Sequence, residues 1–407
     1  MPVNGRKTGH SNGHDNGYGP AYTDGPAAQT VSAPFVGWRP PGCERIALIL
    51  QGGGALGAYQ AGVYEALHQA NVEPDWITGV SIGAINAALI AGNTRENRLA
   101  RLQEFWNRIT SRRIWHYTPD GDIYRQWRNS FSALATLYFG QPGFFKPHVM
   151  NPWLAPAGAK NATSFYDPAM LRETLLELVD FSLINERAVR FAVGAVNVQS
   201  GNFVYFDNGH EVIAPEHIMA SGALPPALPM IKVGTDYYWD GGIVSNTPLQ
   251  HLLDHEDNLD TLVFQVDLFS ARGTLPREMA DVISRHKDIM YSSRTRHNTD
   301  VYRRLHGWKM RLRDILDKVP PEDLNEEDRA LKAELAEMPD MTIVQLIYQQ
   351  MAYEGHAKDY EFSGTSMREH WQSGYDDTRA SLSQRHWLDM PADGTGIVVH
   401  DVHRLRD

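Results

Sequence analysis

The short motif Gly79–Gly83 has the GxSxG spacing of a nucleophilic serine, with Ser81 at its centre. In this motif the serine stands on a sharp turn from strand to helix, where only glycine tolerates the closeness of the neighbouring backbone. The preceding residues 76–80 are β-prone, and Ile82–Gly92 is small and apolar, as a buried helix requires. Such a helix directs its N terminus at Ser81, which favours an alkoxide and an oxyanion. A buried structural serine in a tight turn is the alternative.

A second glycine-rich turn lies earlier, at Gln51–Gly57. Its Gly52, Gly54 and Gly57 also fit GxGxxG, the dinucleotide-binding pattern, which would indicate a nucleotide-binding oxidoreductase. That fold needs an acidic residue at the end of the following strand, where this chain has Ser81. No lysine follows the glycines as it does in a phosphate-binding P-loop. The turn is therefore predicted to present backbone N–H groups to an anion beside the serine.

The candidate base for this serine is Asp240, which follows three aromatic residues and precedes Gly241 and Gly242. The two glycines let the backbone turn sharply and bring the carboxylate near another loop. The aromatic residues would exclude water and raise the pKa of the carboxyl group, as a directly acting aspartate base requires. Taken alone, Asp-Gly-Gly is equally typical of a hairpin turn.

The order of these three motifs resembles the patatin-like phospholipase family, which has a glycine-rich oxyanion loop, a GxSxG serine and a later Asp-Gly-Gly. The resemblance covers roughly residues 44 to 270 and extends to the segment Met219–Pro229, and to Asn246 and Pro248 after the aspartate. It implies an α/β fold, a patatin-like three-layer sandwich with a mainly parallel sheet. The alternation of strand-like and helix-like segments in this region supports such a sheet.

The resemblance also implies a mechanism, in which Ser81 and Asp240 form a catalytic dyad without histidine and cleave fatty acyl ester bonds of lipids. By the family pattern, Gly53 and Gly54 would donate N–H groups to the oxyanion. The geometry of the nucleophile turn adds the N–H group of Ile82. A hydrolase of this kind passes through an acyl-enzyme intermediate.

One position departs from the family pattern. The glycine loop of the family usually carries Arg or Lys before its last glycine, where this chain has Leu56. The loss of that charge bears on loop anchoring, substrate and rate more than on reaction class. It leaves open a catalytically weak scaffold that binds a lipid surface or granule. A hydrolase of hydroxyalkanoate polyesters is a further alternative, since no local pattern defines the pocket walls.

A serine–acid–histidine triad is the alternative to the dyad, because in α/β-hydrolases the histidine follows the acid in the chain. With Asp240 or Asp267 as the acid, the candidate histidines are His286, His297, His400 and His403. None of the four stands in a supporting motif. The dyad is therefore the favoured arrangement.

Composition indicates a globular enzyme, with 407 residues, 42% hydrophobic and 21% charged. The net charge of −11 argues against nucleic-acid binding. No metal-ligand spacing appears, so no cofactor or metal is expected. The oligomeric state does not follow from the sequence.

Several features predict a cytoplasmic protein. Residues 1–41 lack the apolar segment of a signal peptide, and no apolar run approaches the roughly 20 residues that span a bilayer. Cys43 is the single cysteine, which excludes an internal disulfide. Between Arg277 and Arg313, however, basic and apolar residues alternate at helical spacing, which suits peripheral contact with an anionic membrane or lipid surface. A solvated helix pair packed on the hydrolase domain is the favoured alternative.

Composition and predicted secondary structure divide the chain into three regions: a flexible tail (1–43), an acyl hydrolase domain (44–270) and a mainly helical C-terminal extension (271–407). Strands are predicted at Val189–Asn197, Asn202–Phe206 and Leu262–Leu268, and a core-facing helix at Met341–Tyr353.

Two further segments are noteworthy. Phe139–Phe145 is suited to an apolar wall or lid over an acyl chain, or to a packed surface loop. Tyr360–Ser363 and Ser366–Trp371 resemble the helical extension of a bacterial subset of patatin-like proteins.

Overall fold

A computed structural model of the chain describes residues 38–110, 140–254, 257–293, 295–336, 338–350, 354, 358–392 and 395–401. Most of the predicted tail, together with Phe139, Tyr353 and His403, lies outside the described residues. The chain from Val36 onward forms one compact unit. Within the described residues, no helix is both long and apolar enough to cross a membrane.

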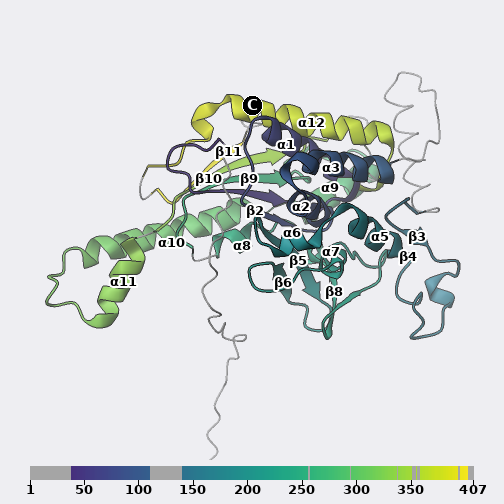
Figure 1. The fold of residues 1–407 in the computed structure, drawn as a ribbon, viewed down its shortest axis with the longest axis horizontal. Helices are drawn as coiled ribbons and strands as arrows, with labels where there is room; N and C mark the ends of the chain where they lie inside the picture. Colours follow the sequence, from purple (N-terminus) through teal and green to yellow (C-terminus); the bar gives the residue numbers. More distant parts are fainter. Residues whose placement is uncertain are drawn as a thin grey trace, which may run out of the picture. The chain divides into compact units, whose positions relative to one another are not determined.

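A nine-stranded sheet forms the centre of this unit (Figure 1). Its strands are β1 (Arg45–Leu50), β2 (Trp76–Gly79), β5 (Arg190–Asn197), β6 (Phe203–Asp207), β7 (Ile231–Val233), β8 (Asp236–Asp240), β9 (Thr261–Asp267), β10 (Met341–Ile347) and β11 (Ile397–Asp401). They follow the order β11-β10-β9-β1-β2-β5-β8-β7, and β6 also pairs with β5. The strands from β11 to β5 pair in parallel, while β6, β7 and β8 pair antiparallel. The predicted mainly parallel sheet is confirmed.

Helices cover both faces of the sheet and complete three layers. The buried strand β1 shows why: Ile46, Leu48 and Leu50 join the core on one face, while Ala47 and Ile49 join the core on the other. The first face packs against α1 (Ala58–Gln69), α2 (Ile82–Ala91), α3 (Arg95–Ile109) and α12 (Gly364–Ser383), and the second against α8 (Leu249–Leu253) and α10 (Thr295–Leu316). The predicted three-layer sandwich is confirmed.

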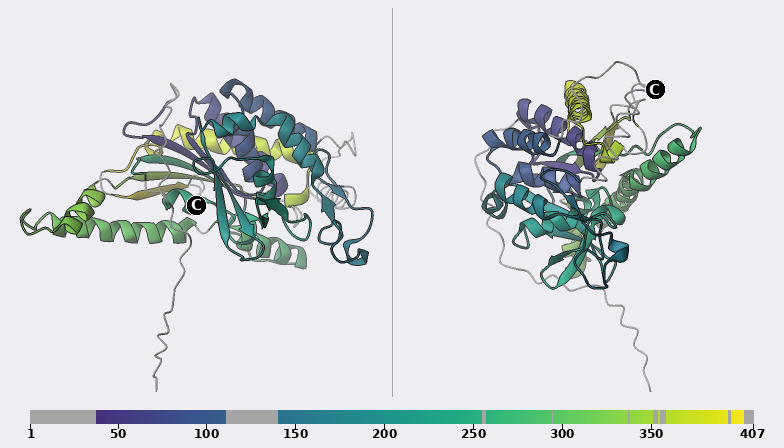
Figure 2. Two further views of the ribbon diagram at one scale, coloured as in Figure 1. Left: turned by 60° about the horizontal axis from the view of Figure 1, so that its bottom comes forward. Right: turned by 90° about the vertical axis from the view of Figure 1, so that its right-hand side faces the viewer.

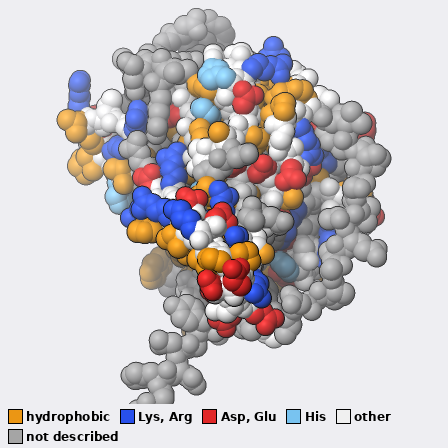
Figure 3. Space-filling model, turned by 90° about the vertical axis from the view of Figure 1, so that its left-hand side faces the viewer, with side chains coloured by type: hydrophobic (Ala, Val, Ile, Leu, Met, Phe, Trp, Pro, Cys, Tyr) orange, Lys and Arg blue, Asp and Glu red, His pale blue; other side chains and the backbone are white. Residues whose placement is uncertain are grey.

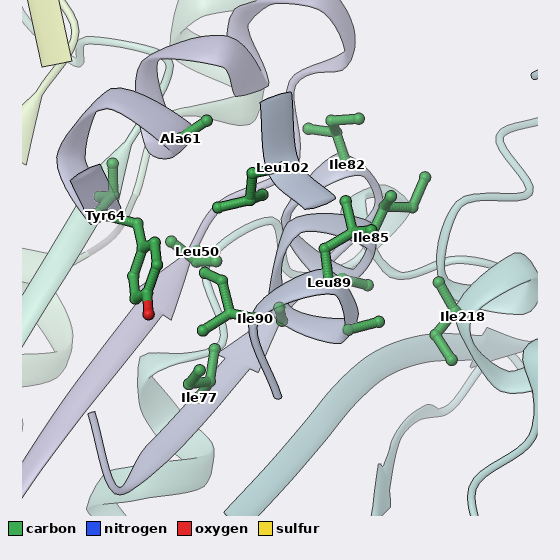
Figure 4. Close-up of a cluster of buried hydrophobic side chains, with 14 of the residues drawn as sticks. Leu50, Ala61, Tyr64, Ile77, Ile82, Ile85, Leu89, Ile90, Leu102 and Ile218 are labelled. Carbon is green, nitrogen blue, oxygen red and sulfur yellow. The ribbon is translucent and has the colours of Figure 1, made fainter. Parts of the chain in front are cut away.

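Helix α2, which follows Ser81, is buried along its whole length. Figure 4 shows its isoleucine and leucine side chains between the strands and the neighbouring helices, with Leu50 and Ile77 on one side and Leu102 on another. A helix packed in this way cannot shift without opening the core. The N terminus of α2, and with it Ser81, is therefore held in a fixed position.

Shorter elements and the remaining helices surround this frame. They are η1 (Gly54–Gly57), β3 (Lys146–Pro147), η2 (Pro152–Leu154), β4 (Tyr166–Asp167), α5 (Ala169–Leu178), α6 (Phe181–Asn185), α7 (Pro215–Ser221), η3 (Gly241–Ile243), α9 (Met279–Tyr291), α11 (Glu326–Ala336), η4 (Lys358–Tyr360) and η5 (Arg385–Trp387). The strands predicted before and after the turn at Gln199–Gly201 are β5 and β6, and the strand predicted at Leu262–Leu268 is β9.

The helix predicted at Met341–Tyr353 is wrong, because the described part of this segment contains strand β10. The strand lies between β9 and β11, so both of its faces are buried, and its sequence is mostly apolar without the alternation of a half-buried strand. A run of this kind cannot be distinguished from a buried helix by periodicity. The region after residue 270 therefore contributes helices α9 to α12, as predicted, and also two strands of the central sheet. A domain boundary at residue 270 stays a prediction.

Candidate active site

Ser81 stands at the turn between β2 and α2 with positive φ, at φ 57° and ψ −123°. This conformation is strained for a residue with a side chain. The flanking glycines are required by space, since a Cβ on Gly79 would lie 2.4 Å from the backbone of Gly83, and one on Gly83 would lie 2.3 Å from the carbonyl of Leu50. The backbone N–H of Ser81 donates to Ser221 Oγ at 3.1 Å, which fixes the turn from the other side.

Asp240 is the last residue of β8, and only 2% of its surface is exposed. Its Oδ1 accepts the backbone N–H of Gly242 at 2.7 Å. Burial raises the pKa of this carboxyl group to about 7, although the Gly242 N–H group and the nearby Ser81 hydroxyl act to lower it. Gly241 is required at the turn, because a Cβ there would lie 2.6 Å from the Gly194 carbonyl on β5. The structure thus brings together the two residues predicted as a dyad.

The glycine loop passes directly beside the serine. A Cβ on Gly52 would lie 3.1 Å from Ser81 Cβ and 2.4 Å from Asn246 Oδ1, and Gly54 has φ +54°. Among the described residues, the N–H groups of Gly53, Gly54 and Ile82 meet no backbone acceptor. Gly53 and Gly54 line the same cavity as Ser81, whereas Ile82 does not line it and instead packs its side chain against Gly57.

Side-chain amides anchor this loop by its carbonyl groups. Three of them donate at 2.6 to 3.0 Å: Gln60 to Gln51 O, Asn86 to Gly57 O, and Asn246 to Gly52 O. Leu56 is fully buried in the main core and directs no group at the serine. Because the carbonyl groups are held by buried donors, the loop has anchors other than the charged residue that is usual in the family.

A cavity of about 370 Å³ opens beside Ser81, Asp240 and the glycine loop. Its walls are mainly apolar, and the predicted wall segment contributes Phe144 and Phe145 to them. Phe144 meets Phe362 of the C-terminal region edge to face, with ring centres 6.2 Å apart. The C-terminal region therefore completes the wall of the cavity, which has the polar end and apolar body expected of a site for an acyl chain.

Two crossed ion pairs join α9 to η4 at this cavity. Lys287 Nζ lies 2.7 Å from Asp359 Oδ1, and Lys358 Nζ lies 2.7 Å from Asp288 Oδ1. Lys287 and Asp359 line the cavity, and the carbonyl of Asp359 would lie 2.3 Å from a Cβ on Gly54. The sequence analysis did not assign these pairs to the site. The repeated Lys-Asp dipeptide is their only signal in the sequence, and it is a weak one.

A second buried carboxylate, Asp267, lies at the end of β9 and is 1% exposed. Its oxygens accept from Ser293 Oγ and Gln265 Nε2, both at 2.8 Å, and from Thr247 at 3.4 Å. Burial raises its pKa to about 6 against these hydrogen bonds. Thr247 in turn accepts Gln51 Nε2 at 2.8 Å, so Asp267 supports the base of the glycine loop.

The histidines of the alternative triad are not placed at the cavity. Among the described residues, His286, His297 and His400 are absent from its lining, and His400 stacks on Trp387 with ring centres 5.5 Å apart. His403 lies outside the described residues.

Comparison with known proteins agrees with this geometry. Residues 48–253 match the family model described as patatin-like phospholipase, and residues 289–394 match a second one described as patatin phospholipase. The first match alone covers half of the chain, and the protein belongs to the patatin-like phospholipase family.

Curated relatives carry the name lysophospholipase. The chain is 40% identical over 244 residues to lysophospholipase nte1 of Aspergillus terreus, covering 60% of this chain and 13% of that protein. It is 25% identical over 242 residues to lysophospholipase NTE1 of Cryptococcus neoformans, covering 59% of this chain and 12% of that protein. The chain thus spans a small part of the length of these relatives.

Two solved structures are similar at low identity. VipD from Legionella pneumophila matches at 15% identity with a TM-score of 0.37, over 84% of this chain and 67% of that one. Human GIVD cytosolic phospholipase A2 matches at 11% identity with a TM-score of 0.40, over 84% of this chain and 59% of that one.

Proposed function

We propose that this protein is a serine-dependent lipid acyl hydrolase that uses Ser81 and Asp240 as a catalytic dyad. The observation that carries the proposal is that Ser81 and the buried Asp240 meet at the polar end of an apolar cavity, where the serine hydroxyl is close enough to act on the pKa of the carboxyl group. A carboxyl group with a pKa near 7 is suited to accept a proton at neutral pH and to return it. Membership in the patatin-like phospholipase family and the names of the curated relatives support ester hydrolysis.

The reaction proceeds in two steps. Asp240 accepts the proton of Ser81 Oγ as the oxygen attacks the acyl carbonyl carbon, and the N–H groups of Gly53, Gly54 and Ile82 hold the oxyanion. Asp240 then gives the proton to the leaving alcohol, which leaves an acyl group on Ser81. Asp240 then takes a proton from water as the water attacks that ester, and it returns the proton to Ser81 Oγ as the C–Oγ bond breaks and the fatty acid is released.

The substrate class is lipids with fatty acyl ester bonds, because the phenylalanine-lined walls accept a hydrocarbon chain and exclude water from the reaction. We place the protein in the cytoplasm, where it works in peripheral contact with a membrane or lipid surface.

Hydrolysis of p-nitrophenyl esters with graded acyl chain lengths tests the proposal. We expect turnover by the wild type with an optimum at longer chains, and a loss of at least about 1,000-fold in Ser81→Ala. A fluorophosphonate probe should label the wild type and leave the folded Ser81→Ala variant unlabelled. Turnover that persists in this variant would reject the serine mechanism. Absence of turnover in the folded wild type would also reject it and would favour the alternative of a lipid-binding scaffold.

A further inference from the structure

Helices α10 and α11 form a hairpin that projects away from the central sheet, as Figures 1 and 2 both show. The hairpin has a small core of its own, built from Leu316, Leu324 and Leu335. Its base is fastened to the sheet by the hydrogen bond of 3.0 Å from Arg303 Nε to the Ile397 carbonyl on β11. The hairpin is therefore an ordered part of the fold, stabilised by its own small core and by its attachment to the sheet.

A row of large apolar side chains on α10 takes no part in this packing. Leu305, Trp308, Leu312 and Ile315 are 58%, 66%, 37% and 58% exposed. Their spacing of three, four and three residues places them on one face of the helix. Within the described part of the chain, none of the three hydrophobic clusters includes them. Figure 3, viewed from the side to which the hairpin projects, shows hydrophobic side chains in a row there, with Lys and Arg along one side and Asp and Glu along the other.

Exposed arginines lie along one side of this row. Arg304 and Arg311 are exposed on the same side of the helix, and the Arg311 guanidinium lies 5.2 Å from the centre of the Trp308 ring. The sequence of α10 contains six Lys and Arg residues against two Asp residues, in a chain whose net charge is −11. An apolar stripe that contains tryptophan and is bordered by arginine matches the boundary between headgroups and acyl chains.

The neighbouring helix α9 continues the apolar surface toward the cavity. Met279, Ile283 and Ile289 are 71%, 48% and 57% exposed, and Met290 is 55% exposed while it also lines the cavity. In the left view of Figure 2, both helices lie along the lower edge of the molecule. Apolar side chains are therefore exposed on the helix that connects α10 with the cavity.

We infer that the Leu305–Ile315 face of α10 docks on a lipid surface with anionic headgroups. The choice of a lipid surface rests on the proposed function, and the arginines beside the row select an anionic one. A second copy of this chain is a poorer fit, because pairing two such faces would bring their arginines together. Docking through α10 and α9 would bring the cavity to the lipid that it hydrolyses.

Sedimentation with vesicles tests the inference, using the full-length Ser81→Ala protein so that the vesicles stay intact. We expect binding to phosphatidylcholine vesicles that contain phosphatidylglycerol, weaker binding to phosphatidylcholine alone, and loss at high salt. The double variant Arg304→Glu/Arg311→Glu should bind roughly 30-fold more weakly. Trp308→Ser/Leu312→Ser should also bind weakly, at unchanged net charge.

The matched control is Arg368→Glu/Arg379→Glu, which makes the same charge change on exposed positions of α12. Equal loss in this control, or unchanged binding of both α10 variants, would overturn the inference. Dimerisation of the parent protein that Trp308→Ser/Leu312→Ser abolishes would assign the face to a second copy. The hydrolase proposal has a separate readout, because p-nitrophenyl ester turnover requires no vesicle.

Discussion

Asp240 and Asp267 each end a strand of the central sheet and are almost fully buried, yet their surroundings differ. Asp267 is surrounded by side-chain donors, from Ser293, Gln265 and Thr247, which occupy its oxygens. Asp240 has the Gly242 N–H and the Ser81 hydroxyl, and it borders the cavity. Burial alone therefore does not identify a catalytic base. Asp240 differs from Asp267 because it lies beside the Ser81 hydroxyl, which can lose its proton when it attacks a substrate in the cavity.

The largest expected difference between the two carboxylates is in catalysis. Asp240→Asn should lower kcat by about 1,000-fold, because an amide cannot accept the serine proton. Asp267→Asn should lose no more than about tenfold, through a loosened glycine loop. Both are measured with p-nitrophenyl esters on variants whose folding is checked by circular dichroism. Equal losses in the two variants would contradict the assignment of Asp240 as the catalytic base and of Asp267 as a support of the glycine loop.

The next largest expected effect is on the pH dependence of kcat/KM for a neutral ester. Burial raises the pKa of Asp240 from 3.8 to about 7, so the carboxyl group is protonated at lower pH and cannot act as a base. Activity should therefore rise with pH through about 7. Asp267→Asn should leave that midpoint in place. A midpoint near the ordinary pKa of an aspartate would show that burial does not tune the base.

The smallest expected effect is on the melting temperature, which should rise in Asp240→Asn and fall in Asp267→Asn. A pKa raised in the folded state means that ionisation opposes folding, by at most roughly 4 kcal/mol for Asp240 at alkaline pH. Asp240→Asn can keep its partners, so it should raise the melting temperature, and more at about pH 8 than at about pH 5. Asp267→Asn also removes a carboxyl group whose pKa is raised, to about 6, but it turns an amide N–H₂ toward donors, so it should lower the melting temperature, and by less at about pH 8 than at about pH 5. A stabilised Asp267→Asn would contradict the donor-rich description of that site.

Local backbone geometry explains why the polar half of the site was predictable. Gly79, Gly83 and Gly241 are required by neighbouring backbone within 3 Å, so they leave a fixed spacing in the sequence. The aromatic residues before Asp240 similarly predicted a buried carboxyl group with a raised pKa. The family pattern added the prediction that Gly53 and Gly54 donate N–H groups to the oxyanion.

The rest of the site depends on contacts between distant segments. The Lys287 and Asp359 pair joins positions 72 residues apart, and neither residue carries a local signature. Strand β10 was mistaken for a helix because burial on both faces removes the alternation that reveals a strand. The apolar wall was anticipated at Phe144 and Phe145, but its partner Phe362 comes from the region whose role the sequence left undefined.

Strand β9 pairs with β1 on one side and β10 on the other, and it lies between the two segments that match family models. Its backbone hydrogen bonds therefore join the two segments in a single sheet. A fragment cut after β9 would leave that strand as a bare apolar edge, open to pairing with other chains. Exchange of C-terminal segments among relatives would likewise have to preserve the register of β10 against β9. The two matched segments thus share one sheet within one compact unit.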